Sequence, residues 1–391
     1  MYYKIVTICF IGLASVLISG CDEYDNRSTQ IQSINFDASR KPQNYQLKDI
    51  AKNIEYIELE SSSESFIGEI SQILYNENHI LVLDKKLQEI FLFSSKGKFI
   101  RKIGRRGNGP GEYGTVFSVD LTPDGLIYLH STGNKILEYN ISGDFTRSIP
   151  LKKIKLQYFK VIGERVVFAI PYPLTEVCGG YSLGVMDKTG NIKNKFLFRN
   201  QPNNGKPQGI VCNTGFYTRS DSICFWEYIY DTIYCITPKG FLAPKWVINY
   251  GSNAIPRDAF RDIGTLNSAK HSGMFLVSHL LESKEHMFFI ALQHRRRQLY
   301  ILKKRNGEIL TISPKEKHFF GLSNNFDFGP SFWPQNNVND STIACVLNPE
   351  KLILMSQDEQ LLSKIKNDDL FQILKLINVK SNPVLMKVTT K

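Results

Sequence analysis

A ten-residue loop at residues 104–113 contains the most unusual local chemistry of the chain. Its sequence, GRRGNGPGEY, places four glycines beside Arg105 and Arg106. Glycines such as Gly107 and Gly109 let consecutive backbone N–H groups point at one anion, and arginines beside them add positive charge. Arg105, Arg106, Gly107 and Gly109 are therefore candidate ligand contacts. The alternative is a crossing between two structural units, which needs tight turns with positive φ.

The surroundings of this loop exclude two common phosphate-binding motifs. A P-loop would continue through Gly-Lys and Ser or Thr into a helix, and no such residues follow residue 113. The dinucleotide fingerprint also requires a helix after its glycines, whereas short strand-like runs flank this loop.

A row of aromatic residues is a second candidate binding feature. Trp226, Tyr228 and Tyr230 fall on one face of a predicted strand at residues 224–231, because side chains alternate along a strand. Aromatic rings in a row can stack on sugar rings, which makes Trp226 a candidate ligand contact. The same rings also suit packing between sheets, and this is the alternative.

Three ionisable residues lie at comparable places near predicted strand ends, namely Asp84, His130 and Asp187. If their strands surround one axis, they could converge on a divalent ion such as calcium. The alternative is that the aspartates bind the amides of turns. No Ser/His/Asp set or carboxylate pair can be assigned, so we predict no catalytic residue, no metal ligand and no cofactor, with calcium as an open alternative.

The predicted strands that carry these residues form a pattern that repeats along the chain. Short apolar runs at 80–84, 90–93 and 99–103 are separated by polar turns and read as strands. Turns that end in glycine recur at intervals of 46, 47, 50 and 67 residues, at Gly97, Gly143, Gly190, Gly240 and Gly307. A period in the forties that is built of strands is typical of propeller blades.

A sixth unit completes the pattern at residues 331–356, with strands expected at 342–347 and 351–355. The sequence therefore predicts an all-β, six-bladed β-propeller. The alternating segment 56–60 is expected to complete a blade with the other end of the chain, since an open ring would leave unpaired edges. Residues 253–272 read as an insertion, residues 358–376 as a C-terminal helix and residues 384–388 as a last strand.

The first 20 residues read as a lipoprotein signal peptide, with Lys4 ahead of an apolar run at 5–18. Ile18, Ser19 and Gly20 precede Cys21, which is the expected lipidation site. Residues 21–35 are an acidic and polar tether, and residues 36–391 form the propeller. An outer-membrane lipoprotein, surface-exposed or periplasmic, is expected. The alternative is a plain signal peptide with an incidental cysteine.

The net charge limits the classes of binding partner, and the cysteine content limits the possible disulfides. The formal net charge of +11 suits anionic glycans, lipopolysaccharide or nucleic acid, but an exported and tethered protein does not meet nucleic acid. Cysteines after the anchor are odd in number and lack C-x-x-C or zinc spacing, so no disulfide framework is predicted. A single bridge is left open, either between Cys178 and Cys212 or between Cys224 and Cys235, with Cys345 unassigned.

Several motifs resemble those of one bacterial family. These are GRRGNGPGEY at 104–113, DTIY at 231–234, PKWVINYG at 244–251, GPSFWP at 329–334 and NPVL at 382–385. Together they resemble the six-bladed β-propeller lipoproteins of Bacteroidota, relatives of NHL-type propellers, over nearly the whole mature chain. The resemblance implies a fold and an anchor but no reaction. One departure is His130, which stands where the first blade has Asp84.

We therefore predict a lipid-anchored, extracytoplasmic propeller that serves as a ligand- or protein-binding or scaffolding module at the cell envelope. Its expected partners are the membrane, through the lipid, and a glycan, a peptide or an envelope protein. The alternative is a propeller hydrolase or lyase that acts on glycans or lactones with a divalent ion in the central channel. A ring of carboxylates or imidazoles at the channel mouth would favour this enzyme.

Overall fold

The computed structural model describes residues 31–36, 43–152, 154, 156–170, 180–198, 214–227, 230–254, 276–293, 296–312 and 321–391. The chain divides into two units, Met1–Gln30 and Ile31–Lys391, and every described residue belongs to the second. The predicted signal peptide, Cys21 and the predicted insertion beyond residue 254 lie outside the described residues. Within these residues, no helix has the length and apolar character needed to cross a membrane.

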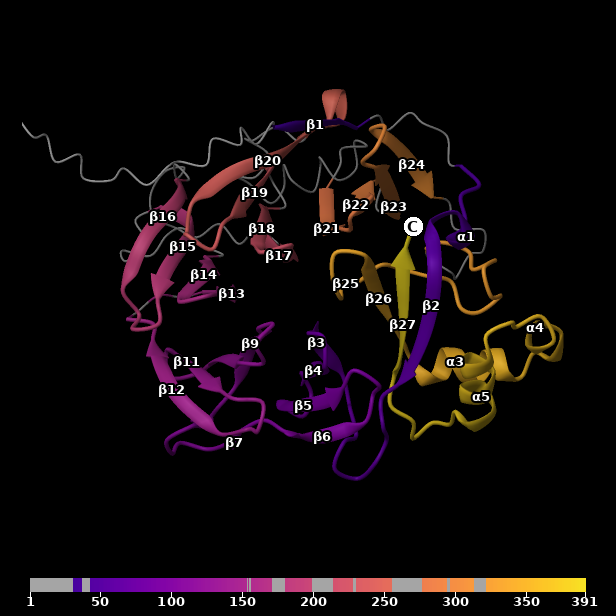
Figure 1. Ribbon diagram of the computed structural model, residues 1–391, viewed down its shortest axis with the longest axis horizontal. Coiled ribbons are helices and arrows are strands. Elements are labelled where there is room, and N and C mark those ends of the chain that lie inside the picture. Colours follow the sequence, from indigo (N-terminus) through magenta and orange to yellow (C-terminus); the bar gives the residue numbers. More distant parts are fainter. Residues whose placement is uncertain are drawn as a thin grey trace, which may run out of the picture. The chain divides into compact units, whose positions relative to one another are not determined.

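Six sheets of mainly antiparallel strands form a closed ring, in which the innermost strands of neighbouring sheets contact one another (Figure 1). The first three blades each contain four consecutive strands: β3 (Ile70–Tyr75), β4 (His79–Asp84), β5 (Glu89–Ser94) and β6 (Phe99–Lys102); β9 (Val116–Leu121), β10 (Ile127–Ser131), β11 (Lys135–Tyr139) and β12 (Phe145–Pro150); β13 (Tyr158–Ile162), β14 (Arg165–Ala169), β15 (Tyr181–Asp187) and β16 (Ile192–Phe198).

Two of the other three blades, the fourth and the sixth, include a strand from the N-terminal segment. The members of the three blades are β17 (Thr214–Arg219), β18 (Ser222–Glu227), β19 (Thr232–Ile236) and β20 (Leu242–Asn249) with β1 (Gln32–Asn35); β21 (Leu276–Glu282), β22 (His286–Gln293), β23 (Arg296–Lys303) and β24 (Glu308–Ile312); β25 (Asn336–Asn337), β26 (Thr342–Leu347) and β27 (Val384–Thr390) with β2 (Ala51–Glu58). The predicted all-β, six-bladed propeller is confirmed.

The recurring glycines lie where the repeat placed them, in the turn between the third and fourth strands of five blades. All five have positive φ: 83° at Gly97, 80° at Gly143, 79° at Gly190, 85° at Gly240 and 71° at Gly307. Only glycine adopts this conformation without steric cost. At Gly97 a side chain would also collide with the carbonyl oxygen of Glu58, so this turn packs tightly against β2.

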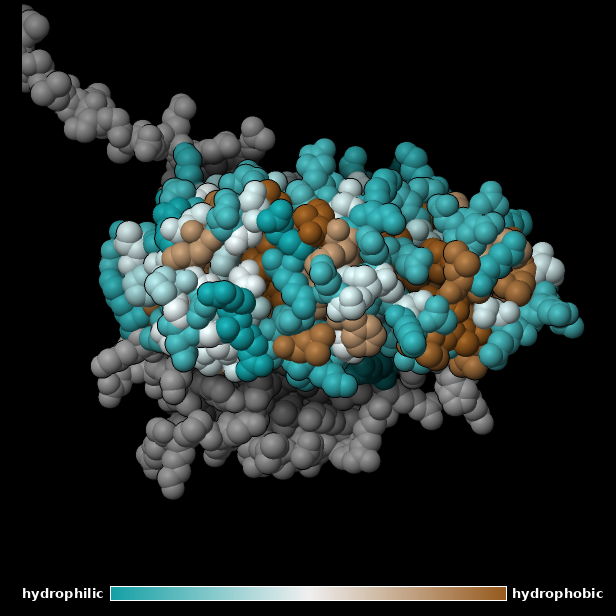
Figure 2. All heavy atoms as spheres, turned by 90° about the horizontal axis from the view of Figure 1, so that it is seen from below, coloured by the Kyte–Doolittle hydropathy of each residue, from teal (hydrophilic) through white to brown (hydrophobic). Residues whose placement is uncertain are grey.

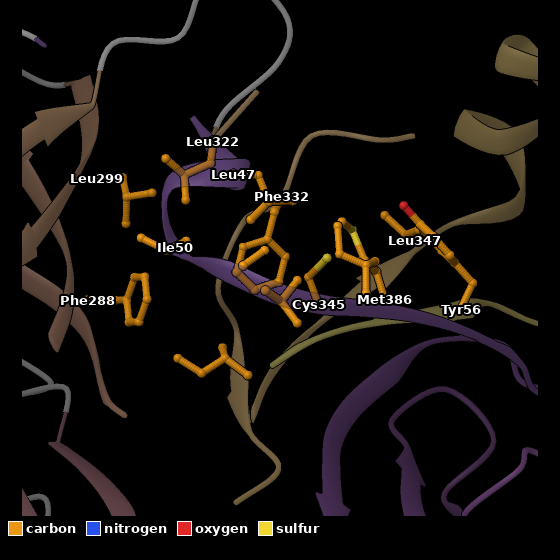
Figure 3. Close-up of a cluster of buried hydrophobic side chains, with 14 of the residues drawn as sticks. Leu47, Ile50, Tyr56, Phe288, Leu299, Leu322, Phe332, Cys345, Leu347 and Met386 are labelled. Atoms are coloured by element: carbon orange, nitrogen blue, oxygen red, sulfur yellow. The ribbon is translucent and has the colours of Figure 1, made fainter. Parts of the chain in front are cut away.

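The core consists of six apolar clusters, and each one lies between two neighbouring blades. Figure 3 shows the cluster between blades five and six. There Phe288 and Leu299 of blade five face Cys345 and Met386 of blade six. Each blade therefore buries apolar side chains against both of its neighbours, and burial of this kind is the main source of stability in a folded chain.

The ring is closed by two strands from opposite ends of the chain. β2 pairs antiparallel with β27 along its whole length, from Ala51 opposite Thr390 to Glu58 opposite Val384. The outer strand of blade six thus comes from the N-terminal segment, as predicted for the segment around residues 56–60. The pairing occupies one edge each of β2 and β27 that would otherwise expose unpaired amides and carbonyls.

The fully buried side chain of Asn382 reinforces this closure. Its Oδ1 accepts a hydrogen bond from the Ile67 amide at 2.8 Å. Its Nδ2 donates to the carbonyls of Glu60 and Ser65, at 2.8 and 2.7 Å. One amide group therefore satisfies three backbone groups of the segment that leads from β2 into blade one.

We expect Asn382→Ala to lower the free energy of unfolding by about 3 kcal/mol, because three backbone groups lose their partner and those that stay buried remain unsatisfied. The matched control is Asn306→Ala in an exposed turn, where the side chain bonds only to Glu308. It should cost less than about 1 kcal/mol. Urea unfolding measures both, and equal losses in the two variants would contradict this role of Asn382.

The N-terminal segment contacts the outer strands of three successive blades. β1 pairs in parallel with β20 of blade four, from Gln32 opposite Trp246 to Asn35 opposite Asn249. The Gln43 amide then donates to the Thr311 carbonyl of blade five at 2.9 Å, and β2 follows on blade six. β1 thus lies within residues 21–35, where the sequence predicted a tether.

The C-terminal helices differ from the prediction in two ways. Residues 351–355 were expected as a strand but belong to α3 (Pro349–Ser356), because proline is favoured in the first turn of a helix after Asn348. The predicted helix at 358–376 is present as two helices, α4 (Glu359–Leu362) and α5 (Asp368–Leu376). α1 (Leu47–Ile50) and a 3-10 turn, η1 (Gly251–Asn253), complete the helical elements of the described chain.

Candidate functional site

The glycine-rich loop at 104–113 connects blade one to blade two. Two short strands, β7 (Arg105–Arg106) and β8 (Glu112–Tyr113), pair in parallel and fold it back on itself. The Gly107 amide donates to the Tyr113 carbonyl at 2.9 Å. The loop is therefore an inter-blade crossing, which is the alternative that the sequence left open.

An acidic side chain of the loop itself occupies the predicted anion nest. Glu112 Oε2 accepts from the Gly109 amide at 2.8 Å, and Glu112 Oε1 lies 2.7 Å from Arg105 Nε. A side chain on Gly107 would overlap this carboxylate. The Gly109 amide, together with Arg105, holds the pKa of the Glu112 carboxyl below its ordinary value. Arg105 and Arg106 remain exposed on the rim, and their role as ligand contacts stays a prediction.

Trp226 lies inside the protein rather than on a binding face. Its side chain is 6% exposed and packs between blades four and five with Tyr217 and Trp246. The structure thus favours the packing alternative for Trp226, which offers little ring surface to a ligand. Tyr228 is outside the described residues.

Both oxygens of the Asp84 carboxylate accept hydrogen bonds from backbone amides. Asp84 is completely buried at the end of β4. Its two oxygens accept from Gly68 at 2.5 Å, Glu69 at 3.2 Å, Lys86 at 2.7 Å and Leu87 at 2.8 Å. This set of bonds joins the entry into blade one to the turn after β4, so Asp84 acts as a structural residue.

Asp187 and His130 have structural surroundings too. Asp187 accepts from the hydroxyl of Thr189 at 2.7 Å and from the amide of Asn191 at 2.9 Å, and these bonds lower the pKa of its carboxyl. His130 is 7% exposed and lies against Phe117, with ring centroids 5.0 Å apart. Across the described residues, no three His, Cys, Asp or Glu side chains lie close enough to hold a metal ion.

Two buried histidines should make the protein sensitive to acid. Burial lowers the pKa of both His130 and His286 to about 4. The unfolded chain therefore binds protons between pH 6.5 and pH 4 that the folded chain does not bind, so stability should fall across this window as the pH falls. The loss should be about 3 kcal/mol for each histidine when the window is crossed completely.

Urea unfolding at pH 7.5 and pH 5 measures this loss. The double variant His130→Gln and His286→Gln should lose less stability between the two pH values than the parent chain, because its glutamines do not titrate. An equal loss in both proteins would show that carboxyl groups, and not these histidines, cause the acid sensitivity.

A groove of about 820 Å³ lies on the rim where the ring closes. Its walls come from the end of β2 and the following segment, from the turn between β5 and β6, and from the connection between α5 and β27. The lining residues are Glu58, Glu60, Ser61, Ser62, Ser63, Phe66, Lys96, Gly97, Lys98, Leu376, Asn378, Lys380 and Ser381. The volume is within the range of small-molecule and short-polymer binding sites.

The groove combines hydrogen-bonding groups with an apolar border. Phe66 and Leu376 are 48% and 71% exposed, and neighbouring Val379 is 81% exposed. Figure 2 shows hydrophobic side chains gathered on the side that carries the C-terminal helices, at the right of the view. Sequence reasoning missed this groove. Its only local signal was the three-serine run at 61–63, which is also common in ordinary turns.

One of the two cysteine bridges that the sequence left open is present. Cys224 on β18 and Cys235 on β19 form a disulfide, while Cys345 is a buried free thiol. The other pair, Cys178 and Cys212, lies outside the described residues.

The closed ring of six sheets, five of them four-stranded and one five-stranded, defines this protein as a six-bladed β-propeller. Residues 31–389 match the family described as Domain of unknown function (DUF4934), and the chain belongs to this family. No curated protein matches the chain. The lipid anchor and the relation to NHL-type propellers stay predictions.

Several solved structures are similar to this chain. A Bacteroides fragilis protein whose name describes it as exported is 16% identical, with a TM-score of 0.72 over 92% of this chain and 99% of that chain. A member of the DUF4221 family from Bacteroides vulgatus is 10% identical, with a TM-score of 0.46 over 66% of this chain and 84% of that chain. A virginiamycin B lyase from Staphylococcus aureus is 15% identical, with a TM-score of 0.37 over 68% and 75% of the two chains. The last two similarities are too low to carry an argument.

Proposed function

We propose that this protein is a lipid-anchored binding or scaffolding module outside the cytoplasm, and that the groove at the ring closure is its ligand site. The observation that carries the proposal is the groove itself, an open space of about 820 Å³ on the rim. Asn382 holds two of its walls together through hydrogen bonds to Glu60 and Ser65, which reduces the ordering that a ligand must impose on binding.

The use of ionisable side chains supports a binder over an enzyme. The carboxylates of Asp84 and Asp187 accept hydrogen bonds from backbone amides of their own turns. A general base or metal ligand needs a lone pair that is directed at the substrate or the ion. The hydrolase or lyase alternative would require a different set of residues.

The lining of the groove favours a glycan segment as the ligand. Ser63 supplies a hydroxyl group, while the hydroxyls of Ser61 and Ser62 already accept hydrogen bonds from the amides of Asn382 and Ser65. The lining contains three lysines, Lys96, Lys98 and Lys380, against the two carboxylates of Glu58 and Glu60, and this positive surplus suits anionic sugars. The half-exposed ring of Phe66 offers an apolar face of the kind that packs on a sugar ring. Hydrogen bonds to such polar groups fix the orientation of a hydroxyl-rich ligand, while the aromatic ring of Phe66 excludes water.

A glycan panel tests this assignment on residues 22–391, which contain every strand of the ring. We expect saturable binding of a neutral or acidic oligosaccharide, with a rise in melting temperature, because the ligand binds only the folded chain. Phe66→Ser should weaken binding about tenfold or more. The matched control is Phe198→Ser, which removes another exposed ring, 58% accessible on blade three, and should leave binding unchanged.

The same samples distinguish this binding role from the hydrolase or lyase alternative. Stoichiometric calcium that is removed by EDTA, together with turnover of a glycan or lactone, would replace the binding role by the enzyme. Binding that survives Phe66→Ser would remove the ligand from this groove.

The anchor has a separate test. The apolar run at 5–18 followed by Cys21 supports lipidation, and the Bacteroides fragilis neighbour is described by its name as exported. We expect the full chain to fractionate with membranes and Cys21→Ser to release it or to block its processing, because acyl chains at Cys21 are the proposed attachment. A Cys21→Ser chain that stays processed and membrane-bound would contradict the anchor.

A further inference from the structure

The disulfide of blade four joins a completely buried cysteine to a partly exposed one. Cys224 and Cys235 stand directly opposite each other on the paired strands β18 and β19. Cys224 is completely buried among apolar side chains between blades four and five. Cys235 is only half-buried. A thiolate from solution can therefore reach Cys235 more easily than Cys224.

A lysine is directed at the buried sulfur by a bulge. In β20, Pro244 pairs with Tyr234 and Trp246 pairs with Ile233, so Lys245 has no partner on β19. Extra residues of this kind turn a side chain away from its regular direction. The ammonium of Lys245 lies 3.9 Å from Cys224 Sγ and 3.1 Å from Glu282 Oε2.

The charges around Lys245 leave a surplus of one positive unit. Glu282 is completely buried and lies 2.6 Å from Lys304 Nζ and 3.8 Å from Arg219 Nε. Arg219 also forms an ion pair with Asp340. Three cations thus surround two carboxylates. A thiolate at Cys224 would neutralise the surplus, and a nearby cation favours the thiolate over the thiol.

We propose that Cys224–Cys235 is a thiol–disulfide exchange site, with Cys235 as the attacked sulfur and Cys224 as the leaving thiolate. An external thiolate attacks Cys235 Sγ and forms a mixed disulfide, while the electron pair of the broken S–S bond stays on Cys224 Sγ beside Lys245. A second thiolate attacks the external sulfur of the mixed disulfide and releases Cys235 as a thiolate. Two thiols thereby supply the two electrons that reduce the bond.

The remaining free cysteine of the described chain provides an internal comparison. Cys345 is 2% exposed in the cluster between blades five and six, and burial raises the pKa of its thiol to about 12. A buried thiol of this kind is inert. Reaction with an external thiol should therefore be confined to the blade-four pair within the described residues.

Reduced glutathione at pH 7.5 is the probe, applied to residues 22–391 and followed by acid quenching, alkylation and mass spectrometry of the peptides. We expect the first adduct on Cys235 and an alkylated Cys224. Lys245→Met should slow the reaction about tenfold, since a leaving thiolate without a neighbouring cation is more basic and leaves more slowly. Lys193→Met, which removes an exposed lysine of blade three, is the control and should react at the parent rate.

Three results would overturn the proposal: a first adduct on Cys224, reaction only after the chain has unfolded, or equal rates for the two lysine variants. If Lys245→Met does not fold, the position of the first adduct in the parent chain still decides between the two sulfurs.

Discussion

Closure of the ring is the constraint on which the rest of the structure depends. The six apolar clusters form an unbroken cycle, and each blade contributes to two of them. The cycle is complete only when β2 pairs with β27, because both strands belong to the blade that contacts blades one and five. Asn382 binds the segment that leaves this blade, and the groove lies at the same junction. The ligand site that we propose is thus formed by the same segments that close the ring.

Much of the fold could be predicted from the sequence, because its signals are local. Gly97 and its four counterparts mark turns through a backbone requirement that is independent of the surroundings. The strand prediction for residues 351–355 was wrong because five mainly apolar residues are compatible with a strand and with a short helix equally well. Only the cap at Asn348 and Pro349 separates the two. β1 was missed because its four residues are mostly polar and gain their place by pairing with β20.

The residues of the candidate site were harder to predict. The type of a residue shows which groups it can offer, but not where its side chain points in the folded protein. Arg105 and Asp84 have the right groups for ligand binding, yet the structure pairs Arg105 with Glu112 and Asp84 with backbone amides. Beyond the serine run at 61–63 the groove has no local signal, because its walls are ordinary surface residues from three distant segments. The contact of Lys245 with Cys224 depends on a bulge, which no spacing in the sequence reveals.

The path of the N-terminal segment also determines how the protein bears mechanical load. Tension that enters the chain ahead of residue 31 meets β1 first, where four residue pairs join it to β20. Next comes Phe36, wedged against Tyr300 with ring centroids 4.7 Å apart. Only after these contacts and the Gln43 bridge does the force reach β2. The strand that closes the ring is therefore shielded, because tension applied ahead of residue 31 must first break contacts on blades four and five.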